Sequence, residues 1–220
     1  MKFRAAAITF ASFALLAGSM GPAVADNADA ERRMMTQKDV PASFGKPTSF
    51  DFDAKVVGKT IGICDNANGQ TLVSVPAPPR QYLVDIETKN KKTYTEVLER
   101  VWQFSSPQSA QTAFTQLSSN LATCNGTTTM EQDGPGLSQT VTTGSEPGGA
   151  NQSFWINVAG TWSGGDLPTS TRTVVYAVYV QAGNAIVETV AYINGRARLT
   201  PKQRGDLSRL AQRNGTRWAR

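Results

Sequence analysis

Histidine is absent from all 220 residues of this sequence, and cysteine occurs only twice. Without histidine, a Ser-His-Asp or Cys-His nucleophile and every histidine-containing metal site are excluded. Two cysteines are too few for a four-thiolate zinc site. Carboxylate pairs, a Ser-Lys pair and calcium sites built from oxygen ligands survive this exclusion, although the loop spacing of a known calcium motif is also missing. We therefore predict no cofactor, no metal site and no enzymatic activity.

A strong net charge is also absent. The sequence has 22 Lys and Arg residues against 17 Asp and Glu residues, a formal net charge of +5. The basic residues are scattered, apart from a short group at residues 89–92 and the last segment of the chain. Non-specific nucleic-acid binding needs a dense basic face, so we predict no nucleic-acid partner.

No apolar run is long enough to anchor the chain stably across ~30 Å of hydrocarbon. The longest, residues 5–16, follows two positive residues and is followed by small residues, with Ala23 and Ala25 at the −3 and −1 positions of a cleavage site. This arrangement is typical of a secretory signal peptide. We predict that residues 1–25 are removed near Ala25, and that the mature chain has no transmembrane span and is secreted or resides in the cell envelope. An uncleaved N-terminal anchor is the alternative.

The two cysteines, Cys64 and Cys124, predict a disulfide bond if the chain is exported to an oxidising space. Two unpaired thiols are the alternative. A bond across about 60 residues stabilises the folded chain by roughly 4 kcal/mol in the chain-entropy model.

The rest of the chain suits one folded domain. Residues 26–33 are predicted to be a polar leader, and residues 34–220 a single domain. A helical turn is expected in residues 34–40 and should end at Pro41, because proline disfavours helix in the residue before it.

Two amphipathic helices are predicted from their first residues. Ser106 caps the first, which ends near Cys124, and Thr200 with Gln203 forms a capping box for the second. The first helix carries an apolar stripe at 3.6-residue spacing, made of Ala110, Ala113, Phe114, Leu117 and Leu121.

Alternating apolar side chains predict strands in the remaining segments, among them 81–88, 94–104, 153–161, 173–181 and 186–193. Gly183 and Asn184 predict a tight hairpin that places Val180 opposite Val187, Val178 opposite Thr189 and Tyr176 opposite Ala191. The fold class is therefore α+β, a largely antiparallel sheet packed by two main helices and stapled by the disulfide. Within segment 94–104, Glu99 and Arg100 are interpreted as a solvated pair.

Several of these features resemble the PknH-like extracellular (sensor) domain family of mycobacteria and related actinobacteria. The segment from Met34 to Pro41 is similar to the opening motif of those domains, and a helix closed by Cys124, the final hairpin and a closing helix also match, over roughly residues 33–218. The resemblance implies an antiparallel sheet with packed helices, disulfides and a cleft for an unidentified ligand. This chain can form one disulfide where the kinase domain has two, and it has Leu121-Ala122-Thr123 where a tryptophan usually precedes the cysteine.

These observations favour a secreted, non-catalytic, sensor-type domain that binds an unknown cell-wall or extracellular ligand or protein. Trp102, Trp155, Trp162 and Tyr179 are the candidate ligand-binding residues, because four large rings together can line an apolar cleft. Ordinary core packing is the alternative for each of them.

Two other functions stay open. The first is a carboxylate-dependent extracellular hydrolase, since glycosidases need two carboxyl groups about 5–10 Å apart across a cleft. Its candidates lie on neighbouring predicted strands: Asp85, Glu87, Glu96 and Glu99. The second is a structural cell-envelope protein without a small ligand, which the Gly-, Ser- and Thr-rich segment 126–150 permits.

Overall fold

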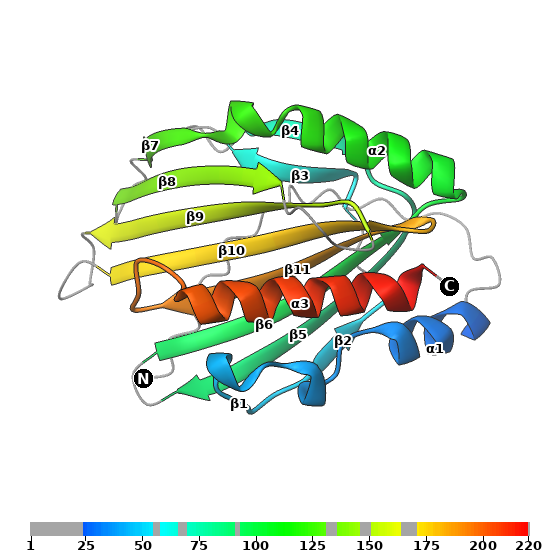
Figure 1. Ribbon diagram of the computed structural model, residues 1–220, viewed down its shortest axis with the longest axis horizontal. Helices are drawn as coiled ribbons and strands as arrows, with labels where there is room; N and C mark the ends of the chain where they lie inside the picture. Colours follow the sequence, from blue (N-terminus) through cyan, green and yellow to red (C-terminus); the bar gives the residue numbers. More distant parts are fainter. Residues whose placement is uncertain are drawn as a thin grey trace.

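The protein is described by a computed structural model over residues 24–54, 58–65, 70–90, 93–130, 136–145, 151–163 and 171–219. One large antiparallel sheet dominates the molecule, with a long helix lying across one of its faces (Figure 1). A second helix and a separate two-stranded hairpin pack on the other face. This is the predicted α+β architecture.

The helices are α1 (Val24–Arg33), α2 (Pro107–Ser119) and α3 (Pro201–Trp218), with short 3-10 helices η1 (Gln37–Asp39), η2 (Ala42–Phe44) and η3 (Leu121–Cys124). The strands are β1 (Lys46–Pro47), β2 (Asp51–Asp53), β3 (Thr60–Asp65), β4 (Thr71–Pro76), β5 (Arg80–Asn90), β6 (Thr93–Gln103), β7 (Gly126–Met130), β8 (Gly136–Ser145), β9 (Ser153–Ser163), β10 (Thr171–Ala182) and β11 (Ala185–Asn194).

The strand order of the large sheet is β1-β5-β6-β11-β10-β9-β8-β7, and β2 also pairs with β5. Strands β3 and β4 pair only with each other. The β10–β11 hairpin has the predicted register, with Val180 opposite Val187 and Tyr176 opposite Ala191. Its turn begins at Gly183, whose φ of 57° lies in the left-handed region that glycine adopts at little cost.

Helix α3 closes one face of the sheet. The predicted capping box is present, and it begins the helix at Thr200 and Gln203. Because its apolar residues recur at helical spacing, Leu207 and Leu210 are completely buried against the strands. Near its end the Trp218 ring stacks on Tyr82 of β5, with 5.6 Å between the ring centroids.

The N-terminal segment completes the cover of this face. Met34, Met35 and Phe44 are buried in the same core as α3. The predicted polar leader, residues 26–33, is helical, and Ala30 of α1 is buried in that core as well. The predicted signal peptide lies outside the described residues up to position 23. None of the helices in the described part of the chain has the length and hydrophobicity of a membrane span.

Helix α2 packs on the opposite face. The predicted cap is formed by Ser106, whose hydroxyl oxygen accepts a hydrogen bond from the Ser109 N–H at 3.1 Å. Phe114 of α2 packs against Phe154 of β9, which in turn stacks on Tyr179 of β10 with 4.7 Å between centroids. This run of three rings joins α2 to the middle of the sheet.

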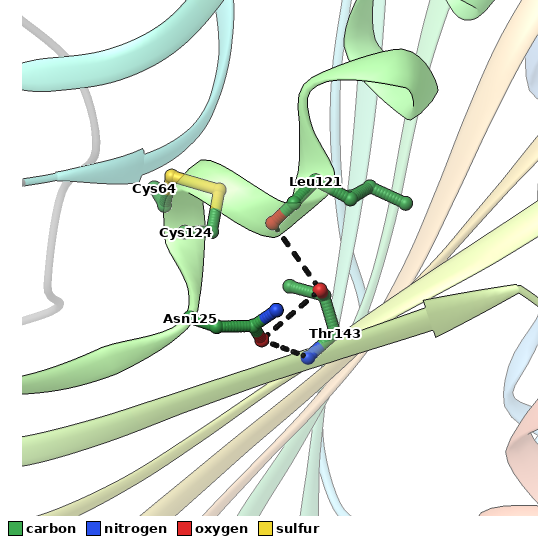
Figure 2. The surroundings of a disulfide bond; sticks show 5 residues. All are labelled: Cys64, Leu121, Cys124, Asn125 and Thr143. Atoms are coloured by element: carbon green, nitrogen blue, oxygen red, sulfur yellow. Dashed lines mark hydrogen bonds between the residues drawn. A yellow bond between two sulfur atoms is a disulfide. The ribbon is translucent and has the colours of Figure 1, made fainter.

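The predicted disulfide is confirmed. It joins Cys64 of β3 to Cys124 of η3, with 5.7 Å between the Cα atoms (Figure 2). Beside it, Thr143 of β8 donates its hydroxyl to the Leu121 carbonyl at 3.2 Å, and its backbone N–H to the Asn125 side-chain oxygen at 2.9 Å. The disulfide therefore ties the β3–β4 hairpin to a segment that is itself bonded to the large sheet.

Candidate functional site

A cavity of about 270 Å³ lies between β3 and the face of the sheet opposite α3. Alternation along five neighbouring strands brings its walls together, because every second side chain points to the same face. The lining residues are Gly62, Ile63, Leu83, Asp85, Glu96, Leu98, Arg100, Ile156, Val158, Val175, Ala177, Tyr179, Glu188, Val190 and Tyr192.

Much of the cavity wall is apolar. Leu98, Val158 and Val175 contribute to it from three different strands, and each remains partly exposed. All three pack against the core around α2 but are not completely covered by it, so the wall can contact an apolar molecule.

Two acidic side chains meet at one wall of the cavity. Asp85 of β5 and Glu96 of β6 share a hydrogen bond. Burial, then the hydrogen bond and charge of Asp85, raise the pKa of Glu96 to about 8. Burial also raises the pKa of Asp85, and the charges of Glu87 and Asp51 act in the same direction. A hydrogen bond between two carboxyl groups requires one proton, so the pair holds a proton near neutral pH.

A second polar group lies along the same face. The Arg100 guanidinium forms an ion pair with Glu188 at 3.3 Å, and the Tyr179 hydroxyl donates to the other Glu188 oxygen at 2.5 Å. The guanidinium carbon also lies 5.5 Å from the centre of the Trp102 ring. Glu188 is 7% exposed, and its two carboxylate oxygens each have a partner, which is what a buried charge requires.

The solvated Glu99–Arg100 pair expected from the sequence is wrong. Neighbours along a strand point to opposite faces. Arg100 therefore points to the cavity, whereas Glu99 is completely buried on the α3 side and accepts a hydrogen bond from the Met35 N–H. Burial raises the pKa of Glu99 to about 8, against the lowering effects of that hydrogen bond and of the Arg217 charge.

The four predicted aromatic residues do not line one cleft. Tyr179 lines the cavity. Trp102 is buried in the core around α2, beside the guanidinium of Arg100. Trp155 points to the α3 face, where it stacks on Tyr176 with 5.7 Å between centroids. Trp162 is paired with Leu137 and Thr171 in the backbone of β9, and its side chain is outside the described parts of the chain. The ligand-binding role of these four residues stays a prediction.

The predicted hydrolase carboxyls divide between the two faces. Asp85 and Glu96 lie together in the cavity, while Glu99 is on the other side of the sheet. Glu87 is exposed and accepts a hydrogen bond from the Tyr94 hydroxyl at 3.1 Å. Asp85 and Glu96 are in direct hydrogen-bond contact, which is closer than the separation of roughly 5 Å or more that glycosidases use.

The sequence interpretation did not identify most of the cavity residues as one group. A signal that could have found part of it was present on β6, where every second residue, Glu96, Leu98 and Arg100, points to the same face. Among the residues that the structure describes, no three Cys, Asp or Glu side chains gather closely enough to hold a metal ion.

The chain is similar to one family of known proteins. The family model of the PknH-like extracellular domain matches residues 26–196. The crystal structure of the extracellular domain of PknH from Mycobacterium tuberculosis aligns with a TM-score of 0.49 at 13% sequence identity, over 84% of this chain and 93% of that one. No curated protein matches the chain in sequence.

Proposed function

This chain belongs to the family of PknH-like extracellular domains, and we propose that it acts outside the cytoplasm as a non-catalytic domain that binds a small ligand in the cavity. The observation that carries this proposal is the cavity itself, with an apolar wall and a few polar groups along it. That combination is common in small-molecule sites, where apolar contacts supply affinity and a few polar groups orient the ligand.

The disulfide supports the location. Bonds of this kind persist in oxidising spaces and are rare in the cytosol. The predicted signal peptide would deliver the chain there, and cleavage near Ala25 would leave all but the first two residues of α1 in the mature protein. Intact-mass analysis of the culture supernatant tests this step. We expect a species that begins at or near Asp26 and lacks two hydrogen atoms relative to the dithiol; a full-length, cytosolic chain with two alkylatable thiols would contradict it.

Ligand binding is tested by native mass spectrometry of the protein purified from its host. A bound small molecule is expected on the wild type and is expected to be lost in Val175→Trp, because the larger ring fills the cavity. Leu72→Trp is the matched control, since it adds the same ring at an exposed position of β4 outside the cavity. A molecule that remains on Val175→Trp, or that is lost from both variants, does not occupy the cavity.

A further inference from the structure

Charge is unevenly balanced around the cavity. Its described lining residues include three carboxyl groups, Asp85, Glu96 and Glu188, and one guanidinium, Arg100. Arg100 is paired with Glu188, and the remaining oxygen of that carboxylate accepts the Tyr179 hydroxyl. The cation is therefore already matched, and the excess negative charge resides on Asp85 and Glu96.

Within the described residues, the carboxyl pair has no cationic partner of its own. None of the ion pairs in the described parts of the chain includes Asp85 or Glu96. The Oδ1 atom of Asp85 is buried and accepts no hydrogen bond there. A buried acceptor without a donor is costly, so this atom favours a ligand that brings an N–H or O–H group.

The groups around the pair add to its negative field. Glu87 of β5 and Asp51 of β2 both raise the pKa of Asp85 through their charges. On the other side, Tyr192 of β11 lines the cavity close enough to Glu96 for that charge to raise the tyrosine pKa, after the effect of burial. Tyr94 of β6 meets the Tyr192 ring edge-on, with 6.4 Å between centroids. Carboxylates beside an aromatic ring are the surroundings that an organic cation prefers.

We propose that the cavity binds an amphipathic cation, with an ammonium group held by Asp85 and Glu96 beside Tyr192 and an apolar tail against Leu98, Val158 and Val175. This inference rests on the proposed function of the cavity as a ligand site. A volume of about 270 Å³ holds roughly nine non-hydrogen atoms, if each takes up the ~30 Å³ share of a water molecule in the liquid. The chemistry therefore indicates a single short chain with one charged end.

Binding of the ammonium group displaces the proton that the two carboxyls share. The proton passes to the solvent, and the carboxyl pair gains full negative charge as the ammonium group replaces it. Because the pKa of Glu96 is about 8, we expect the affinity for such a cation to rise about tenfold between pH 7 and pH 9. A primary ammonium group with an ordinary pKa near 10.4 keeps its charge over this range.

Three probes of equal length separate the head groups: n-octylammonium, 1-octanol and octanoate. Isothermal titration calorimetry with the disulfide-bonded protein at pH 7 and pH 9 measures each affinity, and two buffers of different ionisation enthalpy report proton release. We expect octylammonium to bind at least tenfold more tightly than the other two at pH 9. We also expect proton release at pH 7 that falls toward zero at pH 9.

Variants locate the effect on the carboxyl pair. Glu96→Gln is expected to weaken octylammonium binding about tenfold at pH 9 and to abolish its pH dependence, with octanol binding unchanged. Glu31→Gln, an equivalent change at an exposed position of α1, is the matched control and should change neither. Thermal unfolding of both variants verifies that they are folded.

The outcomes distinguish this inference from the function beneath it. If octanol or octanoate binds as tightly as octylammonium, and Val175→Trp abolishes that binding, the cavity is a ligand site and the cation preference is wrong. The cation preference is also wrong if octanoate binds more tightly than octylammonium and a substitution of Arg100 abolishes that binding. If none of the three probes binds at millimolar concentration, the cation proposal fails, and absence of a bound molecule on the host-purified protein then removes the proposed function as well.

Discussion

The two faces of the large sheet are covered by different means. On one face, the 18 residues of α3 and the N-terminal segment form a continuous core in which Leu207, Leu210 and Met35 are completely buried. On the other, α2 has 13 residues, and the rest of the cover is the β3–β4 hairpin held by the Cys64–Cys124 bond. The first arrangement closes its face, and the second leaves the cavity. Strands with the same alternation thus build a closed core on one face and a cavity on the other, and the covering elements decide which.

The largest expected effect is on the hairpin cover. Replacing both Cys64 and Cys124 by alanine removes a constraint across 60 residues and should lower the free energy of unfolding by about 4 kcal/mol. Urea unfolding of the variant and of the oxidised wild type measures the difference. Hydrogen exchange should show the greatest loss of protection in β3 and β4, with α3 little changed. A loss below about 1 kcal/mol would mean that packing alone holds the hairpin in place.

A smaller loss is expected from the closed face. Leu210→Ala leaves a cavity in the core between α3 and the sheet, and leucine-to-alanine changes at such sites cost about 3 kcal/mol. Because the sheet separates this core from the cavity, octylammonium affinity should stay within twofold of the wild type. Denaturation and calorimetry on the same preparation test both statements. A large loss of affinity in the folded variant would show that the two faces are coupled.

The buried carboxyl of Glu99 predicts a pH dependence that belongs to the closed face. Its folded pKa of about 8 lies above its ordinary value near 4.5, so the folded state binds more protons between these limits. The stability contribution is therefore present at low pH and is lost as the pH rises through 8, by roughly 1.4 kcal/mol for each pH unit in the window. Glu99→Gln keeps an acceptor for the Met35 N–H and should remove most of this slope in urea unfolding at pH 5, 6, 7 and 8.

Glu96 on the cavity face gives the comparison. Its pKa is also raised to about 8, but the residue is partly exposed, so solvent weakens the penalty for its charge. Glu96→Gln should therefore flatten the stability profile less than Glu99→Gln, while it alone changes the pH dependence of octylammonium binding. If Glu96→Gln flattened the stability profile more than Glu99→Gln, the more strongly buried carboxyl would be the one on the cavity face, which would contradict this comparison.

Local signals made much of this fold predictable. The hairpin register at Gly183 and the caps at Ser106 and Thr200 are set within a few residues, and all were found as predicted. The β3–β4 hairpin was not predicted: β3 contains Gly62, and its pairing with β4 shifts register around Cys64, so its alternation is weak.

The candidate site was only partly predictable, and for a different reason. Asp85 and Glu96 were named from the sequence, but their contact depends on the β5–β6 register, in which Asp85 pairs with Leu98 and Glu96 with Glu87. Alternation along the strands, which the sequence interpretation neglected, explains both the separation of Trp155 from the cavity and the wrong solvated pair. Trp155 lies between Phe154 and Ile156, whose side chains point to the α2 face, so its ring must point to the other. The same parity separates Glu99 from Arg100.

The smallest expected effect concerns the cap of α2. Ser106→Ala removes the acceptor for the Ser109 N–H and should lower the free energy of unfolding by about 1 kcal/mol. Ser106→Gly should lower the free energy of unfolding by only a few tenths of a kcal/mol relative to the wild type, because glycine is also a good cap. The residues that anchor α2 on the cavity face, Phe114 and Leu117, lie beyond its first turn. Fraying of that first turn should therefore leave the disulfide and the α3 core intact. Hydrogen exchange restricted to the first turn of α2 would support this local role, whereas exchange that spreads into β10 and β11 would show that the short helix is essential to the whole sheet.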